Sequence, residues 1–149
     1  MVVRTGAHAD VGQSRPMRYY DLSAANARLT VVRPLLVSLR ADRDEVAREQ
    51  KALLRLEASP DNHAPGVIAE RDQREAAVRD AVARMHQVVS KLVEWDVTLR
   101  DISAGLIDFP ALANGRPVWL CWRLGEDDIA WWHEINTGFD RRQPLAELT

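Results

Sequence analysis

The residues best suited to chemistry gather in the C-terminal third of the chain, between residues 105 and 142. His133 and Cys121 supply an imidazole and a thiol, which are side chains that transition metals bind readily. Carboxylates and one arginine complete the candidate ligand-binding set, which is Asp108, Cys121, Glu126, His133, Glu134 and Arg141. These residue types suggest a metal or small-ligand site, with hydrolytic or redox chemistry as an extension of that hypothesis.

No complete catalytic or cofactor motif accompanies these residues. A single cysteine cannot give paired-cysteine spacing, and no helix carries a second histidine at i+4. A nucleophilic cysteine needs a base and an orienting third group, whereas Cys121 between Leu120 and Trp122 is typical of a small buried hydrophobe. Arg141 and Arg142 are expected to clamp a carboxylate or, more commonly, to pair with the acidic loop of the predicted hairpin. We therefore assign no catalytic residue and no cofactor, with a transition metal ion as the alternative.

Two strands with alternating side chains must position these residues. They are predicted at residues 117–124 and 128–135. If Leu124 pairs with Ile129, His133 lies on an apolar face packed against helices, and Cys121 lies on the opposite face. A turn one residue longer or shorter would bring Cys121 and His133 onto one face. Whatever its role, we expect His133 to be buried and hydrogen-bonded, because its strand neighbours on that face are apolar.

The second face of this hairpin carries the candidate interface residues Trp119, Arg123 and Trp132. Because one helical hairpin covers only one face, the tryptophans on the other face predict an exposed apolar patch. Arg123 and Glu134 on that face can cross-pair about a two-fold axis. We therefore expect a homodimer, with a tail at residues 136–149 that folds back over these rings as the competing account.

Two long helical patterns precede the strands. Apolar residues recur at spacings of three and four from Leu22 to Leu39, and again from Val78 to Leu92. The turn-forming residues 58–66 join the two patterns, which predicts an antiparallel helical hairpin. Ser23 is the predicted N-cap of the first helix, and Pro34 predicts a kink or a break within it.

The patterns together predict an α+β fold, in which a long antiparallel helical hairpin, kinked at Pro34, packs on a small antiparallel β-meander. The meander is expected to have three or four strands, with Asn114-Gly115 as a tight turn and Pro110 ending one strand. The predicted organisation is a flexible leader at 1–17 and a single domain at 18–149, comprising the helical hairpin at 18–96, the meander at 97–135 and an irregular tail at 136–149.

Charge and composition argue against several classes of partner. With a net charge of -2 and a pI near 6.1, the chain lacks the basic excess that gathers phosphates or anionic lipids. No apolar stretch approaches the roughly 20 residues of a membrane span. One cysteine and the absence of a signal-peptide pattern predict a cytoplasmic protein. We expect no nucleic acid and no membrane partner, and instead a protein or small-molecule partner.

Three segments carry a resemblance to a known family: RYYDLSAANARLTVVRPLLVSLR, GLIDFPALANGRPVWLCWRLGEDDIAWWHEI and GFDRRQPL. Together they resemble the bacterial domain-of-unknown-function family 2203 over about residues 18–145. The resemblance implies a small cytoplasmic bacterial protein and carries over no catalytic residue. It marks as motif positions Asp108, Cys121, Trp122, Gly125, Glu126, Trp132, His133, Glu134, Gly138, Phe139 and Arg141.

The sequence favours a non-enzymatic protein-interaction or self-associating module, in which the helical hairpin supports an aromatic-rich sheet. The alternative is a metal- or small-ligand-binding protein with a site around His133, Glu134, Glu126 and Cys121. Both hypotheses depend on which side chains share a face of the sheet.

Overall fold

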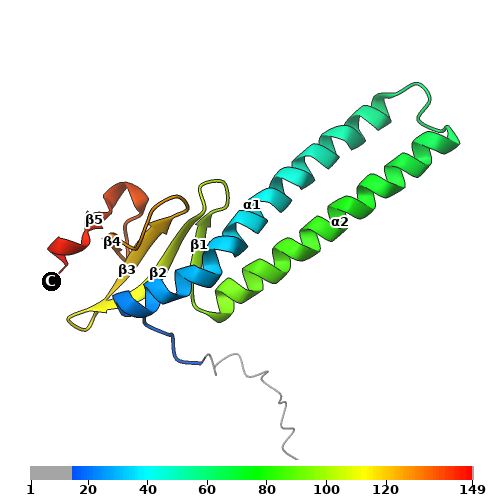
Figure 1. Ribbon diagram of the computed structural model, residues 1–149. Coiled ribbons are helices and arrows are strands. Elements are labelled where there is room, and N and C mark those ends of the chain that lie inside the picture. The colour runs from blue at the N-terminus through cyan, green and yellow to red at the C-terminus, as the bar shows by residue number, and fades with distance from the viewer. Residues whose placement is uncertain (1–14, 149) are drawn as a thin grey trace, which may run out of the picture.

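The computed structural model describes residues 15–148 and arranges them as two long helices beside a five-stranded antiparallel sheet (Figure 1). The helices are α1 (Leu22–Ala58) and α2 (Pro65–Glu94). The strands are neighbours in chain order and are β1 (Thr98–Asp101), β2 (Leu106–Ala113), β3 (Arg116–Arg123), β4 (Trp131–Glu134) and β5 (Gln143–Pro144). The predicted α+β fold, a helical hairpin packed on a β-meander, is confirmed.

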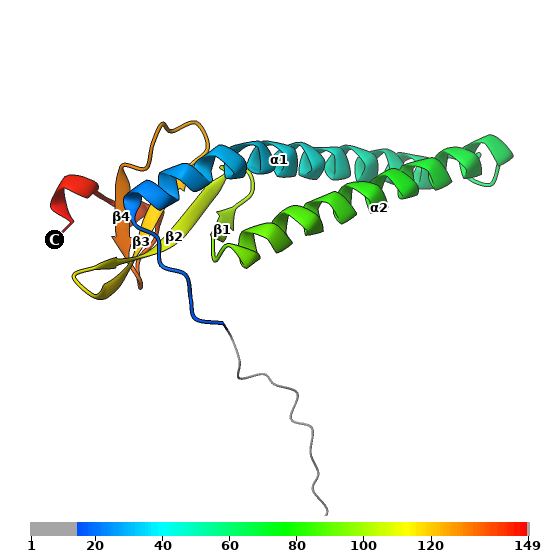
Figure 2. The same ribbon diagram turned by 60° about the horizontal axis from the view of Figure 1, so that its bottom comes forward.

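The N-terminal half of α1 lies across one face of the sheet (Figures 1 and 2). Its buried stripe contains the predicted residues Ala25, Leu29, Val32, Leu36 and Leu39. This stripe shares one apolar core with residues of α2 and of the sheet, which include Leu92, Ile107, Phe109, Leu120, Trp122 and Trp132. Polar contacts fix the helix against the sheet, because Asn26 Oδ1 accepts the Ile129 N–H at 2.8 Å and Arg33 donates to the Asp127 carbonyl at 3.1 Å.

The distal halves of the two helices extend beyond the sheet and bury little apolar surface (Figure 2). Buried positions end at Asp42 on α1 and begin at Ala81 on α2. Farther out, ion pairs such as Arg74–Glu49 at 3.1 Å join the helices. Exposed ion pairs of this kind contribute about 0 to 1 kcal/mol each, so the core near the sheet provides most of the stability.

Helix α1 differs from the prediction at its start and at its proline. Asp21 caps it instead of Ser23, because Asp21 has the extended backbone of an N-cap and its Oδ1 accepts the Ala24 N–H at 2.7 Å. The helix is continuous through Pro34, so the predicted alternative of a break into two helices is wrong. The proline removes one helical hydrogen bond, while buried residues on both sides of it keep the helix packed.

Strand β2 runs through Pro110, which was predicted to end it. The Pro110 carbonyl accepts the Tyr20 N–H at 2.7 Å, so this stretch of backbone points away from β3. A proline at such a position removes no hydrogen bond from the β2–β3 ladder. The predicted tight turn at Asn114-Gly115 is confirmed, since both residues have positive φ, at 51° and 80°, and join the paired residues Ala113 and Arg116.

The ends of the chain contribute contacts that the sequence patterns did not indicate. Most of the predicted leader, residues 1–14, lies outside the described residues. Arg15 donates to Asp96 at 3.2 Å, just past the end of α2, and the Arg18 N–H donates to the same carboxylate at 2.9 Å. The tail, predicted to be irregular, supplies β5. Within residues 15–148, neither helix is apolar over a length that would cross a bilayer.

Candidate functional site

The register between β3 and β4 determines which side chains can meet. Trp119 pairs with His133, and Cys121 pairs with Trp131. Side chains of directly paired residues lie on the same face of a sheet, so Cys121 and His133 share one face. The predicted register, which separated them, is therefore wrong by one residue. The face they share is the one turned away from α1, because the neighbouring side chains Leu120 and Trp132 lie in the core.

The connection between β3 and β4 explains the change of register. The predicted partners Leu124 and Ile129 each bond elsewhere: the Leu124 N–H donates to the Gly105 carbonyl at 3.0 Å, and the Ile129 N–H donates to Asn26. Residues 124–130 consequently form a longer loop than the predicted turn. A one-residue change of register moves every side chain of one strand to the other face.

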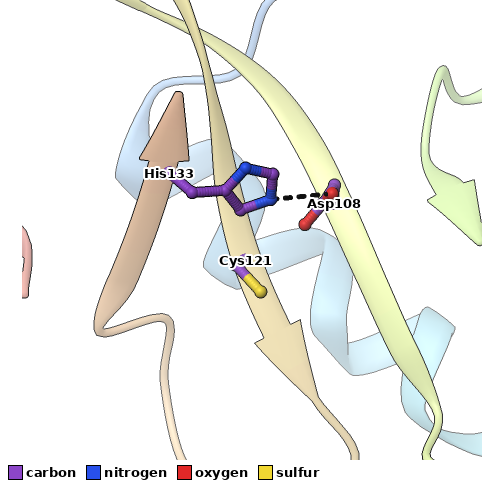
Figure 3. Close-up of side chains that lie close together, drawn as sticks. All are labelled: Asp108, Cys121 and His133. Atoms are coloured by element: carbon purple, nitrogen blue, oxygen red, sulfur yellow. Dashed lines mark hydrogen bonds and ion pairs between the residues drawn. The ribbon is translucent and has the colours of Figure 1, made fainter. Parts of the chain in front are cut away.

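Asp108, Cys121 and His133 converge from three adjacent strands, β2, β3 and β4 (Figure 3). Asp108 and Cys121 are directly paired across β2 and β3. The possible ligand atoms of the three residues lie within 4.8 Å of one another, and each residue is 1% exposed. We call these three residues the Asp–Cys–His cluster. Its position in the middle of a sheet makes it a rigid arrangement.

Both ring nitrogens of His133 lie next to acceptor oxygens. Nδ1 is 2.8 Å from the Glu134 carbonyl oxygen, and Nε2 is 3.0 Å from Asp108 Oδ2. A neutral imidazole carries one N–H, while a carbonyl and a carboxylate only accept. One of the two contacts therefore lacks a hydrogen unless the ring carries two protons, the Asp108 carboxyl is protonated, or a cation binds Nε2. The predicted burial and hydrogen bonding of His133 are confirmed, although its surroundings are polar and not apolar as expected.

The two carboxylate oxygens of Asp108 differ in their hydrogen-bond partners. Oδ2 faces His133 and also accepts a hydrogen bond from Arg100 Nε at 2.8 Å. Oδ1 is buried and has no hydrogen-bond partner among the described residues. A buried carboxylate oxygen without a partner is unfavourable by about 1 to 3 kcal/mol or more. A hydrogen-bond donor or a cation next to Oδ1 would remove this unfavourable contribution.

Arg100 reaches the cluster because of a β-bulge in β1. The pairing with β2 shifts by one residue between Leu99 and Asp101, which leaves Arg100 as the extra residue. Bulges redirect side chains in this way. The guanidinium of Arg100 also stacks over the ring of Trp119 at 5.0 Å. The sequence did not reveal this role, because an arginine after a short alternating strand resembles any exposed charge.

The Cys121 thiol lacks the surroundings of a nucleophile. Burial, and then the nearby Asp108 carboxylate, raises the pKa of Cys121 to about 12, against the opposing effect of Arg142. Neither nitrogen of His133 is directed to the sulfur by a hydrogen bond, since both already contact oxygens. A thiol of this kind stays protonated at neutral pH unless a metal ion displaces its proton.

A cavity of about 340 Å³ adjoins the cluster. It is lined by Arg100, Leu106, Asp108 and Cys121, by Ile135 and by residues 136–139 at the start of the tail. Two of the three cluster residues therefore border a cavity that the tail helps to enclose.

The tail is held over this face by a double ion pair. Arg142 donates from Nη1 to Glu126 Oε1 at 3.0 Å and from Nη2 to Oε2 at 2.8 Å, as expected for a tail arginine that meets the acidic loop. The same guanidinium stacks over the rings of Phe139 and Trp131, at 4.1 Å and 4.8 Å. Burial alone would raise the pKa of Glu126, but its hydrogen bonds with Arg142 and the Arg123 N–H lower it below the ordinary value.

The family model for an uncharacterized conserved protein, DUF2203, matches residues 18–145. The chain belongs to this family. The match spans the whole helical hairpin, the sheet and nearly all of the tail, so the Asp–Cys–His cluster lies inside the family's region. No curated protein and no solved structure is similar enough to this DUF2203 chain to be matched to it.

The other candidate ligand residues of this DUF2203 protein lie outside the cluster. Glu134 is on the opposite face of β4 and pairs with Arg116, although its backbone carbonyl contacts His133. Glu126 is engaged by Arg142 at the tail. Arg141 is exposed in the short 3-10 helix Phe139–Arg141. The candidate set thus separates into three residues that meet and three that do not.

The candidate interface residues do not form the predicted patch. Trp132 is 4% exposed and lies in the core beneath α1, whereas Trp119 lies on the cluster face beneath Arg100. Arg123 and Glu134 also lie on opposite faces, so the expected cross-pairing on one face is wrong. The tail lies against Trp131 through Arg142 and against Trp132 through the Pro144 carbonyl, whereas Trp119 is covered by Arg100, so the competing account holds for Trp132 alone. A homodimer stays a prediction, without the apolar patch that motivated it.

Proposed function

We propose that this DUF2203 protein binds a transition metal ion, with zinc as the first candidate, through Asp108, Cys121 and His133. The observation that carries this proposal is the convergence of a carboxylate, a thiol and an imidazole within 4.8 Å in a buried position. Nitrogen, sulfur and oxygen ligands together suit zinc better than magnesium or calcium, which prefer oxygen alone. Three protein ligands leave one position of a tetrahedral ion for water or another ligand.

The groups around the cluster support the same assignment. In metal sites a histidine usually donates its second ring N–H to a carbonyl or carboxylate, which directs the other nitrogen to the ion. His133 Nδ1 lies 2.8 Å from the Glu134 carbonyl, and this bond leaves the Nε2 lone pair facing Asp108. A cation there satisfies both Nε2 and the unpartnered Oδ1 of Asp108.

Metal binding is also the chemical role that best suits the buried thiol of Cys121. Burial raises the pKa of Cys121 to about 12, so the metal-free thiol is a poor nucleophile, and cysteine-based hydrolysis is the weaker alternative. A bound ion deprotonates a coordinating thiol outright, and the proton leaves to solvent when the ion binds.

The change of register reverses the order of the two functional hypotheses. Self-association was favoured because Trp119 and Trp132 were expected on one exposed face. Their separation removes that support, because Trp132 is buried in the core. The metal hypothesis gains support, because Cys121 and His133 share a face with Asp108.

Elemental analysis of protein purified without chelators tests the proposal. We expect about one zinc or other transition metal ion per chain in the wild type, and a large loss in Cys121→Ser and Asp108→Asn. The matched control is His86→Ala, which removes an exposed histidine of α2 and should leave the metal content unchanged. Circular dichroism of each variant shows whether it is folded.

The proposal fails if folded wild-type protein contains no transition metal and takes up neither Zn²⁺ nor Co²⁺ during dialysis. In that case a proton shared between His133 Nε2 and Asp108 Oδ2 supplies the missing hydrogen without a metal. Metal uptake that survives both substitutions would place the ion elsewhere on the chain and would also overturn the assignment.

A further inference from the structure

We infer that the cavity beside the Asp–Cys–His cluster binds a small monocarboxylate, which occupies the remaining position of the metal ion. The inference rests on the proposed function, since the ion supplies one end of the carboxylate site. The cavity reaches both Asp108 and Cys121, so a ligand in it lies next to two of the three metal ligands. Arg100 lines the same cavity and supplies the second recognition element.

Arg100 is fixed in place before any ligand arrives. Its Nε donates to Asp108 Oδ2 at 2.8 Å, and its guanidinium stacks over the Trp119 ring at 5.0 Å. Among residues 15–148 it makes no other side-chain hydrogen bond, so both terminal nitrogens remain available. A guanidinium fork held in this way matches the two oxygens of a carboxylate. The preorganised side chain also loses little rotamer entropy on binding.

The charge of the site selects a singly charged anion. A divalent ion is neutralised by the Cys121 thiolate and the Asp108 carboxylate, while Arg100 adds one positive charge. Glu126 and Arg142 neutralise each other through their double ion pair. Among the proposed ion, its ligands and the charged side chains that line the cavity, one positive charge thus remains, and a monoanion balances it. A phosphate dianion would leave an uncompensated negative charge, which is unfavourable away from water.

The residues that line the cavity limit the size of the ligand and favour an apolar group next to its carboxylate. Leu106, Ile135 and Phe139 are apolar, whereas Asn136 and Thr137 offer polar groups at the tail. A volume of about 340 Å³ is at the small end of ligand pockets, which span about 300 to 1,000 Å³. The cavity therefore suits a carboxylate with a short aliphatic body better than a nucleotide or a peptide.

Cobalt-loaded protein provides a direct test with butyrate as the probe. Co²⁺ replaces zinc in such sites and its visible absorption bands respond to a change in the fourth ligand. We expect butyrate, titrated at constant ionic strength and neutral pH, to shift these bands with saturation. Butyramide, which has the same shape without the charge, should have no effect, and inorganic phosphate should bind more weakly than butyrate.

Arg100→Gln and Arg116→Gln form a matched pair of variants. Both remove an ion-paired arginine of the sheet, with side chains 41% and 49% exposed, but Arg116 pairs with Glu134 outside the cavity. We expect Arg100→Gln to raise the half-saturating butyrate concentration by about tenfold or more. Arg116→Gln should titrate like the wild type.

The outcomes separate the inference from the proposed function. Cobalt bound with a thiolate charge-transfer band, together with a butyrate response that depends on Arg100, supports both. Cobalt bound without any butyrate response overturns the inference and leaves the metal site standing. A phosphate response equal to or stronger than that of butyrate overturns the choice of a monocarboxylate. No cobalt binding at all overturns both.

Discussion

At the residue scale, His133 faces more acceptors than a neutral imidazole can satisfy. Oxygens of Glu134 and Asp108 occupy its two nitrogens, and Asp108 leaves a further buried oxygen bare. Such groups tolerate burial only when something supplies the missing hydrogen or positive charge. The proposed cation would satisfy the Nε2 atom of His133 and the Oδ1 atom of Asp108 at once.

Replacement of His133 by alanine should destabilise the metal-free protein by about 1 to 3 kcal/mol, because it opens a cavity and leaves Asp108 without a partner. Urea denaturation in the presence of a chelator measures this effect apart from metal binding. His86→Ala is the control and should stay within about 0.5 kcal/mol of the wild type, since His86 is exposed on α2. A similar loss in both variants would contradict the structural role of His133.

The candidate residues could be chosen from the sequence by their side-chain chemistry, but the contacts between them could not be predicted. Imidazole, thiol and carboxylate in one segment were sufficient to select Asp108, Cys121 and His133 as candidates. Arg100 was missed because its position depends on a β-bulge, and no residue type at Arg100 signals that irregularity. Glu134 was selected for its carboxylate, whereas the group that contacts His133 is its backbone carbonyl.

At the scale of elements, the loop between β3 and β4 decides whether the site exists. Gly105 and Leu124 make close contact where this loop begins, because the Leu124 N–H donates to the Gly105 carbonyl at 3.0 Å. A Cβ on Gly105 would lie 2.5 Å from Leu124 Cβ, and the residue has a φ of +64°. The local fold therefore requires glycine at this position.

Gly105→Ala should lower the free energy of unfolding by about 1 to 3 kcal/mol, through a strained φ and a clash with Leu124. Gly66→Ala is a matched control at the start of α2, where a Cβ meets nothing within 4 Å. Thermal or urea unfolding of both variants provides the comparison. Equal stability of the two variants would show that the Gly105–Leu124 contact does not determine the loop.

The tail should loosen in acid, because the lowered pKa of Glu126 reflects its ion pair with Arg142. A carboxyl with a lowered pKa in the folded state stabilises fully above its ordinary pKa of 4.5, and this contribution is lost as the pH falls through the lowered value. The protection factor of the Gln143 amide in β5, which is the measured exchange rate corrected for the slower intrinsic exchange in acid, should therefore fall below pH 4.5.

Glu126→Gln should show this lower protection already at neutral pH, while Glu147→Gln, in the same tail but outside the Arg142–Glu126 ion pair, should behave like the wild type. Exchange at Gln143 that is the same in all three proteins across the pH range would mean that strand pairing alone holds the tail.

The helices and strands could be predicted from the periodicity of apolar residues, but the register between β3 and β4 could not. Repeated spacings of three and four identify a helix from many residues, so one irregular residue such as Pro34 does not change the result. Register depends on a single loop, and Ile129 was read as a strand residue when its N–H bonds Asn26 of α1. A contact between residues so distant in the chain leaves no local pattern.

At the scale of the whole molecule, the sheet has one face in the core and one face that carries the site (Figures 1 and 3). Helix α1 packs against the core face, and the tail covers part of the other face, where Arg142 pairs with Glu126. The long distal hairpin adds few buried residues and lies away from both faces. Folding of the sheet and formation of the cluster are therefore one event, since the cluster joins β2, β3 and β4.

This coupling predicts that metal ions raise the stability of the whole domain. An ion that binds only the folded chain adds about 4 kcal/mol at a free concentration 1,000 times its dissociation constant. The melting temperature of chelator-treated protein should rise with added Zn²⁺, and Mg²⁺ at the same concentration should have little effect, because a thiol and an imidazole do not suit it. Cys121→Ser should lose most of the response, whereas Glu126→Gln should keep it, since Glu126 pairs with Arg142 and lies outside the cluster. If Zn²⁺ raises the melting temperature of both variants equally, the ion binds outside the Asp–Cys–His cluster.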